Sequence, residues 1–174
     1  MPTPSTRHRR LVSVLAVAFV GCAGPGSTGY GQYREAVQPL LAKNTALLNQ
    51  FEQVAIGLKS KSDPRPDAAS IGGTLDSVVL PEAKALAEAA QAVALTEPTL
   101  VPVHQDLVDA WAHRSKAWTD LRAAHVAGDV AAFDAAMELD ARSRLLEDRW
   151  FDAAEAALRA QGEPLLRYPA ATAP

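Results

Sequence analysis

A helical repeat of apolar residues is the feature that most limits the possible folds of this chain. Between residues 30 and 58, large side chains recur at spacings of three and four, which is the repeat of one face of an α-helix. The members of this repeat are Tyr30, Tyr33, Val37, Leu40, Leu47, Phe51, Val54 and Leu58, with Asn44 as the one polar member. Pro39 lies within the segment and predicts a kink or a restart, because it lacks the N–H that would close its turn.

Three later segments show the same helical repeat and almost none of the β-branched alternation of a strand. They cover residues 74–94, 102–126 and 130–158. Pro81 marks a kink or the first turn of the second segment. Asp129 is a candidate N-cap of the fourth segment, and Gly162 is a candidate residue for its end.

The breaks between these segments indicate the topology. Breaker-rich stretches lie at residues 60–73 and 96–102, and the break at residues 127–129 is too short for anything except an antiparallel helix pair. The sequence therefore predicts an all-α fold, an antiparallel up-down-up-down four-helix bundle over residues 33–162. A three-helix bundle with the second segment docked loosely is the alternative. Residues 163–174, which contain Pro164 and Pro169, are expected to pack briefly on the end of the bundle and then fray.

The first 20 residues have the order of an export signal. Three arginines and no acidic residue stand within the first ten positions, and residues 11–20 are apolar except for Ser13. A ten-residue helix is roughly 15 Å long, about half the thickness of a hydrocarbon core. The run is therefore too short for a permanent transmembrane span, and residues 1–21 are predicted to be a signal peptide that forms an isolated helix.

The residues that end this run, Phe19, Val20, Gly21 and Cys22, resemble the lipobox of bacterial lipoprotein precursors. Only the phenylalanine departs from the usual leucine. The resemblance implies cleavage before Cys22 and attachment of diacylglycerol and further acyl chains, such as palmitate, which together make a stable membrane anchor. The glycine-rich residues 22–32 would then form a lipidated flexible tether. The alternative is an ordinary secretory signal in which Cys22 is incidental.

The same resemblance implies a location. The residue after Cys22 is Ala23 and not aspartate, so in a cell with two membranes the lipoprotein would be sorted to the periplasmic face of the outer membrane. In either kind of cell it would be anchored on the extracytoplasmic side. The mature chain would have 153 residues and no further cysteine, which excludes disulfides, cysteine-ligated zinc and cysteine nucleophiles within it.

The charge of the chain and the motifs that it lacks limit the classes of function that are possible. Removal of residues 1–21 takes away three of the 17 basic residues and none of the 20 acidic ones, so the mature chain would carry a net charge of −6. This sign argues against nucleic acid as a partner. The sequence contains no CxxCH, no Glu-x-x-His pair, no HExxH and no GxSxG motif. We therefore expect no cofactor and no enzymatic activity.

The third segment carries a weak candidate metal site. Asp106, Asp109 and His113 lie at i, i+3 and i+7 and share a face that Asp120 extends. A divalent cation could be bound by aspartate and histidine at this spacing. The alternative is a solvated acidic face on which His113 pairs with Asp109 one turn away.

A second candidate site consists of polar residues at inward positions beside two tryptophans. The set comprises Asn44, Trp111, Arg114, Trp118, Asp140, Arg144 and Glu147. Counting from the short turn places Arg114 opposite Asp140 and Arg144, with Asn44 near the same layer. A buried charge is costly unless it is paired, so this layer would form either a satisfied network or a cleft for an anionic or aromatic small molecule. The other possibility is that these side chains reach outward from the flanks of the apolar stripe.

These observations lead to two hypotheses for function. The first is a non-catalytic envelope lipoprotein, anchored to a membrane by its N-terminal lipid and acting through contact with another envelope protein. The second is a small-molecule or metal-binding sensor domain that uses the polar layer or the histidines of the third segment.

Overall fold

The computed structural model describes residues 28–59 and 72–167, and within these ranges every regular element is helical. Helix α1 covers Gly29–Lys59, α4 covers Leu100–Ala127 and α5 covers Val130–Arg159. One further helical segment contains the π-helical turn η1, Leu75–Val79, and α3, Leu80–Gln91. The predicted all-α fold with four helices is therefore confirmed for the described residues. The predicted signal peptide, the lipobox and residues 168–174 lie outside them.

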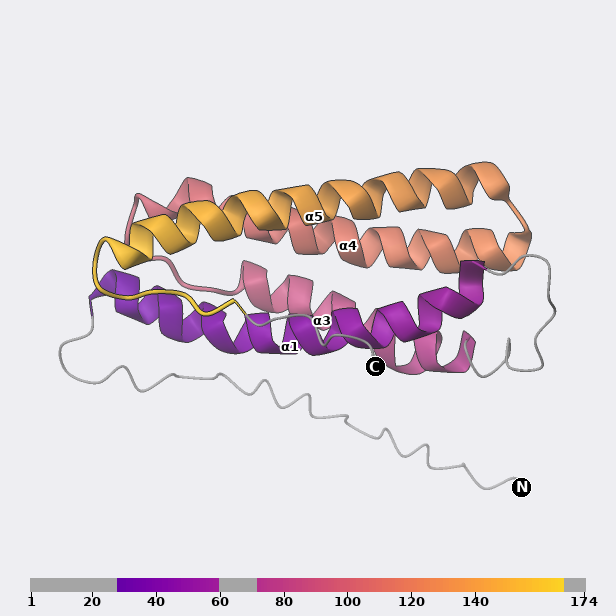
Figure 1. The fold of residues 1–174 in the computed structure, drawn as a ribbon, viewed down its shortest axis with the longest axis horizontal. Coiled ribbons are helices and arrows are strands. Elements are labelled where there is room, and N and C mark those ends of the chain that lie inside the picture. The colour runs from indigo at the N-terminus through magenta and orange to yellow at the C-terminus, as the bar shows by residue number, and fades with distance from the viewer. Residues whose placement is uncertain (1–27, 60–71, 168–174) are drawn as a thin grey trace, which may run out of the picture.

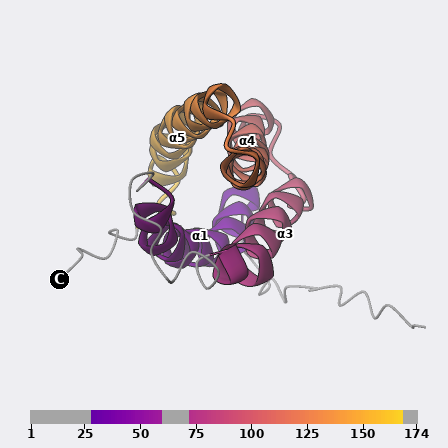
Figure 2. The same cartoon turned by 90° about the vertical axis from the view of Figure 1, so that its right-hand side faces the viewer.

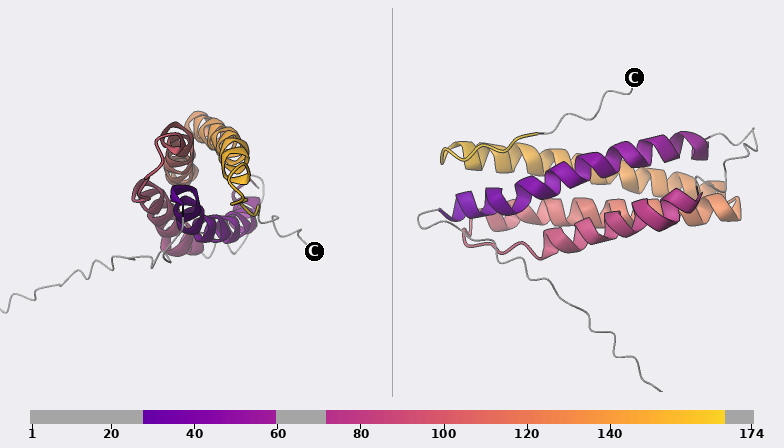
Figure 3. Two further views of the ribbon diagram at one scale, coloured as in Figure 1. Left: turned by 90° about the vertical axis from the view of Figure 1, so that its left-hand side faces the viewer. Right: turned by 90° about the horizontal axis from the view of Figure 1, so that it is seen from below.

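The four helices lie side by side, and helices that follow one another in the chain run antiparallel (Figure 1). Seen from either end, α1, α3, α4 and α5 surround a common core in that order (Figures 2 and 3). The turn between α4 and α5 lies at one end of the molecule, whereas the start of α1 and the end of α5 lie at the other (Figure 1). No helix among the described residues is long and apolar enough to cross a membrane.

Helix α1 begins earlier than the sequence predicts and continues through its proline. Residues 29–32, predicted to be tether, are helical because Thr28 Oγ1 accepts a hydrogen bond from the Gly31 N–H at 3.2 Å and caps the first turn. The predicted restart at Pro39 does not occur. Pro39 and Glu35 are both exposed, so water can satisfy the carbonyl that loses its helical partner.

Pro81 lies in the first turn of α3, directly after the π-helical turn. Because proline has no N–H, it cannot donate to the carbonyl of Ser77 four residues earlier. The turn before it is wider, and the Leu80 N–H bonds to the Leu75 carbonyl five residues back. Pro81 is thus accommodated by a π-helical turn within a continuous helix.

The predicted ends of α5 are confirmed. Asp129 caps the helix by accepting a hydrogen bond from the Ala132 N–H at 3.0 Å. Beyond the last turn, Gly162 has a φ of 77°, which favours glycine, and the Glu163 N–H bonds to the Leu158 carbonyl at 2.9 Å. The turn between α4 and α5 uses Gly128 with a φ of 67°.

The core is built around three tryptophans. Trp111, Trp118 and Trp150 are almost completely buried, and Trp118 stacks on Phe51 with ring centroids 3.9 Å apart. This contact joins α1 to α4 over a distance of 67 residues in the sequence. A stacked aromatic pair adds about 0.5–1.5 kcal/mol beyond the burial of its apolar area.

The buried face of α5 differs in part from the predicted one. The helical repeat of this segment predicts seven inward residues, Val130, Phe133, Met137, Ala141, Phe151, Ala154 and Leu158. Ala154 and Leu158 are buried, Phe133, Met137 and Phe151 are partly buried, and Val130 and Ala141 are exposed. The buried residues of this helix are Ala136, Asp140, Ser143, Trp150, Ala154 and Leu158. Two of the six, Asp140 and Ser143, are polar, so the hydrophobic repeat indicated the buried side of this helix only in part.

We predict that Trp150→Ala in the unlipidated mature chain lowers the free energy of unfolding by about 3–5 kcal/mol, because it removes a fully buried indole. Urea unfolding followed by circular dichroism measures this change. Val130→Ala is the matched control from the same helix, and it should change stability by no more than about 0.5 kcal/mol because Val130 is exposed. Equal effects of the two substitutions would contradict the assigned face of α5.

Candidate functional site

A hydrogen-bonded network around Arg114 occupies the middle of the helical domain. Arg114 is only 2% exposed. Its Nη2 donates to Glu147 Oε2 at 2.5 Å, and its Nη1 donates to Asn44 Oδ1 at 2.8 Å. Asn44 Nδ2 and Trp111 Nε1 both donate to Glu147 Oε1, at 2.6 and 3.2 Å. The network therefore joins α1, α4 and α5. Both Glu147 carboxylate oxygens accept hydrogen bonds, Oε2 from the charged guanidinium and Oε1 from the neutral amide and indole.

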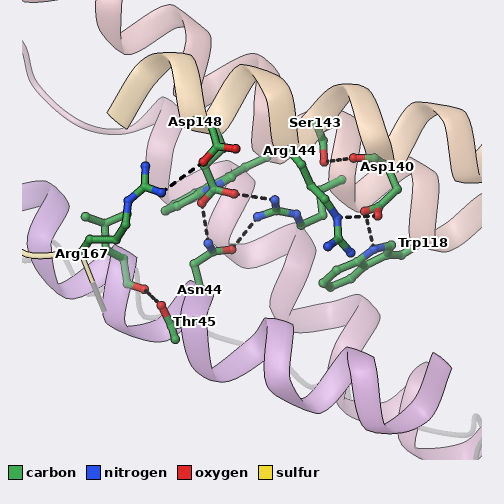
Figure 4. Close-up of polar contacts among 12 residues, drawn as sticks. Asn44, Thr45, Trp118, Asp140, Ser143, Arg144, Asp148 and Arg167 are labelled. Carbon is green, nitrogen blue, oxygen red and sulfur yellow. Dashed lines mark hydrogen bonds and ion pairs between the residues drawn. The ribbon is translucent and has the colours of Figure 1, made fainter. Parts of the chain in front are cut away.

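A second polar cluster lies along α5 beside the first. Asp140 is 3% exposed and accepts hydrogen bonds from Trp118 Nε1 at 2.9 Å and from Arg144 Nε at 3.0 Å (Figure 4). Ser143 Oγ donates to the Asp140 carbonyl at 2.7 Å. Arg144 itself is about half exposed, so this carboxylate is paired with a cation that water also reaches.

The sequence predicted the wrong partner for Arg114. Counting from the short turn placed it opposite Asp140 and Arg144, whereas its guanidinium contacts Glu147 farther along α5. Side chains of a helix lean toward its N-terminus, and in an antiparallel pair this direction is toward the C-terminus of the neighbour. Trp118 is displaced in the same direction and reaches Asp140. The predicted proximity of Asn44 to Arg114 is confirmed.

A third polar group, which was not predicted from the sequence, joins all four helices near the end of the core where α1 begins. His104 Nε2 donates to the Ala90 carbonyl at 2.9 Å, and because this carbonyl can only accept, Nδ1 is left to accept from the Tyr33 hydroxyl at 3.0 Å. Trp150 Nε1 donates to the same hydroxyl oxygen at 2.9 Å. His104 is 4% exposed. The only signal in the sequence was its position three residues before Leu107 on the inward side of the third segment.

Burial sets the protonation of this group. Desolvation lowers the pKa of His104, and the bond to the Ala90 carbonyl opposes the shift only in part. Desolvation also raises the pKa of Tyr33, with the hydrogen bond from Trp150 acting in the opposite direction. Neutral His104 and protonated Tyr33 are therefore the forms that the chain of hydrogen bonds requires.

Two of the three candidate metal residues are bonded to other side chains, whereas Nδ1 of the third, His113, has no hydrogen-bond partner in the described part of the chain. Asp106 Oδ2 accepts a hydrogen bond from Arg149 Nε at 2.7 Å, and this pairing raises the pKa of Arg149. Asp109 accepts from Gln105 Nε2 at 2.8 Å, so the predicted pair with His113 is not formed. Within residues 28–59 and 72–167, no group of three histidine, cysteine or acidic side chains is arranged to hold a metal ion.

Grooves on the described surface lie between neighbouring helices. One of about 510 Å³ between α4 and α5 is lined by Ala123, Ala135 and Leu139 among others, and one of about 410 Å³ between α1 and α3 is lined by Leu40 and Leu86 among others. A third lies between α3 and α4. The six predicted cleft residues, Asn44, Trp111, Arg114, Trp118, Asp140 and Arg144, line none of these three grooves. They are brought together in the core and bonded to one another and to Glu147.

No protein-family model matches the chain, and neither the curated proteins nor the solved structures include a significant match to it.

We predict that Arg114→Ala lowers the free energy of unfolding by about 3 kcal/mol, because it leaves Glu147 and Asn44 without their buried partner. Urea unfolding of the unlipidated mature chain measures the loss. Arg159→Ala is the matched control, since its exposed guanidinium forms an i,i+4 pair with Glu155 worth at most about 1 kcal/mol. A loss for Arg114→Ala no larger than that for Arg159→Ala would refute the central role of the network.

We also predict that the stability of the protein depends on pH through His104. In the unfolded chain histidine has a pKa of about 6.5, so below this pH the unfolded state binds a proton that the folded state excludes. The free energy of unfolding should fall as the pH drops through 6.5, with a slope of up to about 1.4 kcal/mol per pH unit, and this contribution should be constant above about pH 7.5.

Urea unfolding between pH 5.5 and 8 tests this dependence. His104→Gln keeps a neutral donor near Ala90 and should flatten the profile in this range. His125→Gln, at an exposed histidine near the end of the same helix, should leave the profile of the wild type unchanged. A profile that His104→Gln does not alter would show that another group causes the pH dependence.

Proposed function

We propose that the protein is a membrane-anchored envelope lipoprotein whose helical domain acts by binding another envelope protein and not by catalysis. The observation that carries this proposal is the sequence Phe19-Val20-Gly21-Cys22, placed directly after a basic and then apolar run. In this proposal residues 1–21 are the signal peptide, Cys22 carries the lipid, and the domain is an up-down-up-down four-helix bundle. Ala23 after the anchor favours the periplasmic face of the outer membrane if the cell has two membranes.

The position of the first helix supports a short connection to the membrane. Helix α1 begins at Gly29, seven residues after Cys22, and seven residues reach at most about 25 Å when fully extended. The end of the domain that holds the start of α1 would therefore lie close to the membrane. The α4–α5 turn at the opposite end would project roughly 40 Å away, because α4 has 28 residues at 1.5 Å each.

The chemistry of the described interior supports binding in preference to catalysis. The carboxylates of Glu147 and Asp140 and the imidazole of His104 are held in hydrogen bonds to neighbouring side chains and backbone. Groups bonded in this way stabilise the fold and are not presented to a substrate. The net charge of −6 expected for the mature chain favours a partner with basic groups over nucleic acid.

We predict that Cys22→Ala abolishes incorporation of radiolabelled palmitate, because no other residue of the chain carries a thiol, and leaves the protein either unprocessed in the inner membrane or released from the membrane. Ala23→Ser is the matched control, since it changes the next residue and keeps the thiol, and it should be labelled like the wild type. Lipid incorporation by Cys22→Ala would exclude Cys22 as the anchor.

A further inference from the structure

The segment after α5 lies against the domain in the manner of a bound peptide. Residues 163–167 are not helical and run back from the end of α5 between α5 and α1 (Figure 1). We call these five residues the strap. Gln38 on α1 donates from Nε2 to the Leu166 carbonyl at 2.8 Å, and its Oε1 accepts from the Leu166 N–H at 2.9 Å. A residue whose N–H and C=O bond to the same partner is extended, as in a hydrogen-bonded pair of an antiparallel ladder.

Gln38 therefore recognises the backbone of the strap and not its side chain. The side chain of Leu166 is 62% exposed, so any residue could stand there without loss of these two hydrogen bonds. Backbone hydrogen bonds combined with pockets for the neighbouring side chains are how many domains bind extended peptides. The strap has both features.

The two residues beside Leu166 provide the side-chain contacts. Leu165 is 5% exposed and belongs to the hydrophobic core. Arg167 lies over the Phe151 ring, with its guanidinium carbon 4.2 Å from the ring centroid, and its nitrogens approach Asp148 at 3.4 Å and Asp152 at 3.8 Å (Figure 4). The surface that the strap covers thus accepts an apolar residue, here Leu165, followed two positions later by a cation, here Arg167.

The strap is held weakly enough to be displaced. The ion pairs of Arg167 with the two aspartates are largely exposed, and the pair of Glu163 with Arg34 is about one third exposed. Solvent-accessible pairs contribute no more than about 1 kcal/mol each. A terminal segment attached by few buried contacts opens locally without unfolding the domain. Covalent attachment gives the strap an effective concentration in the millimolar range, so a competing segment must bind better or the strap must be weakened.

We propose that the surface between α1 and α5 beside Gln38 is a peptide-binding site, which the strap occupies in this structure. Its ligand is an extended segment of another envelope protein, with an apolar residue followed two positions later by arginine or lysine. This inference rests on the proposed function in that it identifies how the envelope partner is recognised. Asp148 and Asp152, together with the acidic character of the chain, favour a basic segment.

The test uses the unlipidated mature protein and a fluorescent peptide with the sequence of residues 162–167, Gly-Glu-Pro-Leu-Leu-Arg, amidated at its end. Fluorescence anisotropy measures binding to the wild type and to Arg167→Glu, in which the strap is weakened. We expect Arg167→Glu to bind the peptide at least tenfold more tightly than the wild type. Arg142→Glu, the same charge change at an exposed position of α5, should bind like the wild type.

Two further measurements test whether the peptide binds at the surface beside Gln38. Adding Gln38→Ala to Arg167→Glu should weaken binding at least tenfold, and a peptide with serine in place of the first leucine should not bind. Arg167→Ala serves as a second variant that weakens the strap without adding a charge, and circular dichroism checks that each variant is folded. Binding that is equal in the wild type and both Arg167 variants, or that is indifferent to Gln38→Ala, would overturn the proposal.

A second copy of the chain is the competing occupant, since its own strap has the required sequence. Sedimentation of the wild type distinguishes the two cases. A monomer that binds the peptide as described supports a segment of another protein, whereas a dimer that Gln38→Ala dissociates would overturn the proposal in favour of self-association. The assay contains no membrane, so its failure is distinguishable from a failure of palmitate labelling.

Discussion

Arg114 carries a permanent positive charge into the centre of the helical domain, and the arrangement of the helices follows from the need to satisfy it. A guanidinium in this position is tolerated only if carboxylate and amide oxygens surround it. Glu147 and Asn44 supply those oxygens from α5 and α1, and Trp111 donates to the same carboxylate. Three helices are thereby fixed in register at one layer, because a shift of one turn would remove the partners of a buried charge.

Two other buried polar side chains, Asp140 and His104, also have hydrogen-bond partners from other residues. Asp140 is paired between Trp118 and Arg144, and His104 lies in a chain from Trp150 through Tyr33 to the Ala90 carbonyl. In each of the three groups an indole N–H donates to an oxygen of another residue. Tryptophan thus contributes both apolar area and a directional bond, which ties the packing of the core to its hydrogen bonding.

The proposed roles place function on the outside of this core. Most polar groups of the described interior are bonded to one another, with Arg114 Nε as an exception, so recognition is placed on the surface. Between α1 and α5 a polypeptide segment already lies on that surface. The lipid anchor proposed at Cys22 would hold the start of α1, and with it this surface, near the membrane. A basic segment of a membrane-associated neighbour would then meet Asp148 and Asp152 at short range.

The sequence by itself determined the number and approximate bounds of the helices, because the repeat of three and four, the breaks and the caps at Asp129 and Gly162 are local properties. It also indicated that Asn44 and Arg114 share a layer. It placed Asp140 inward but did not determine the whole buried face of α5, since Val130 and Ala141 follow the hydrophobic repeat and are exposed, whereas Ser143 does not follow it and is buried. Only the tertiary structure decided that face, because whether a polar side chain can be buried depends on partners from other helices that no local pattern contains.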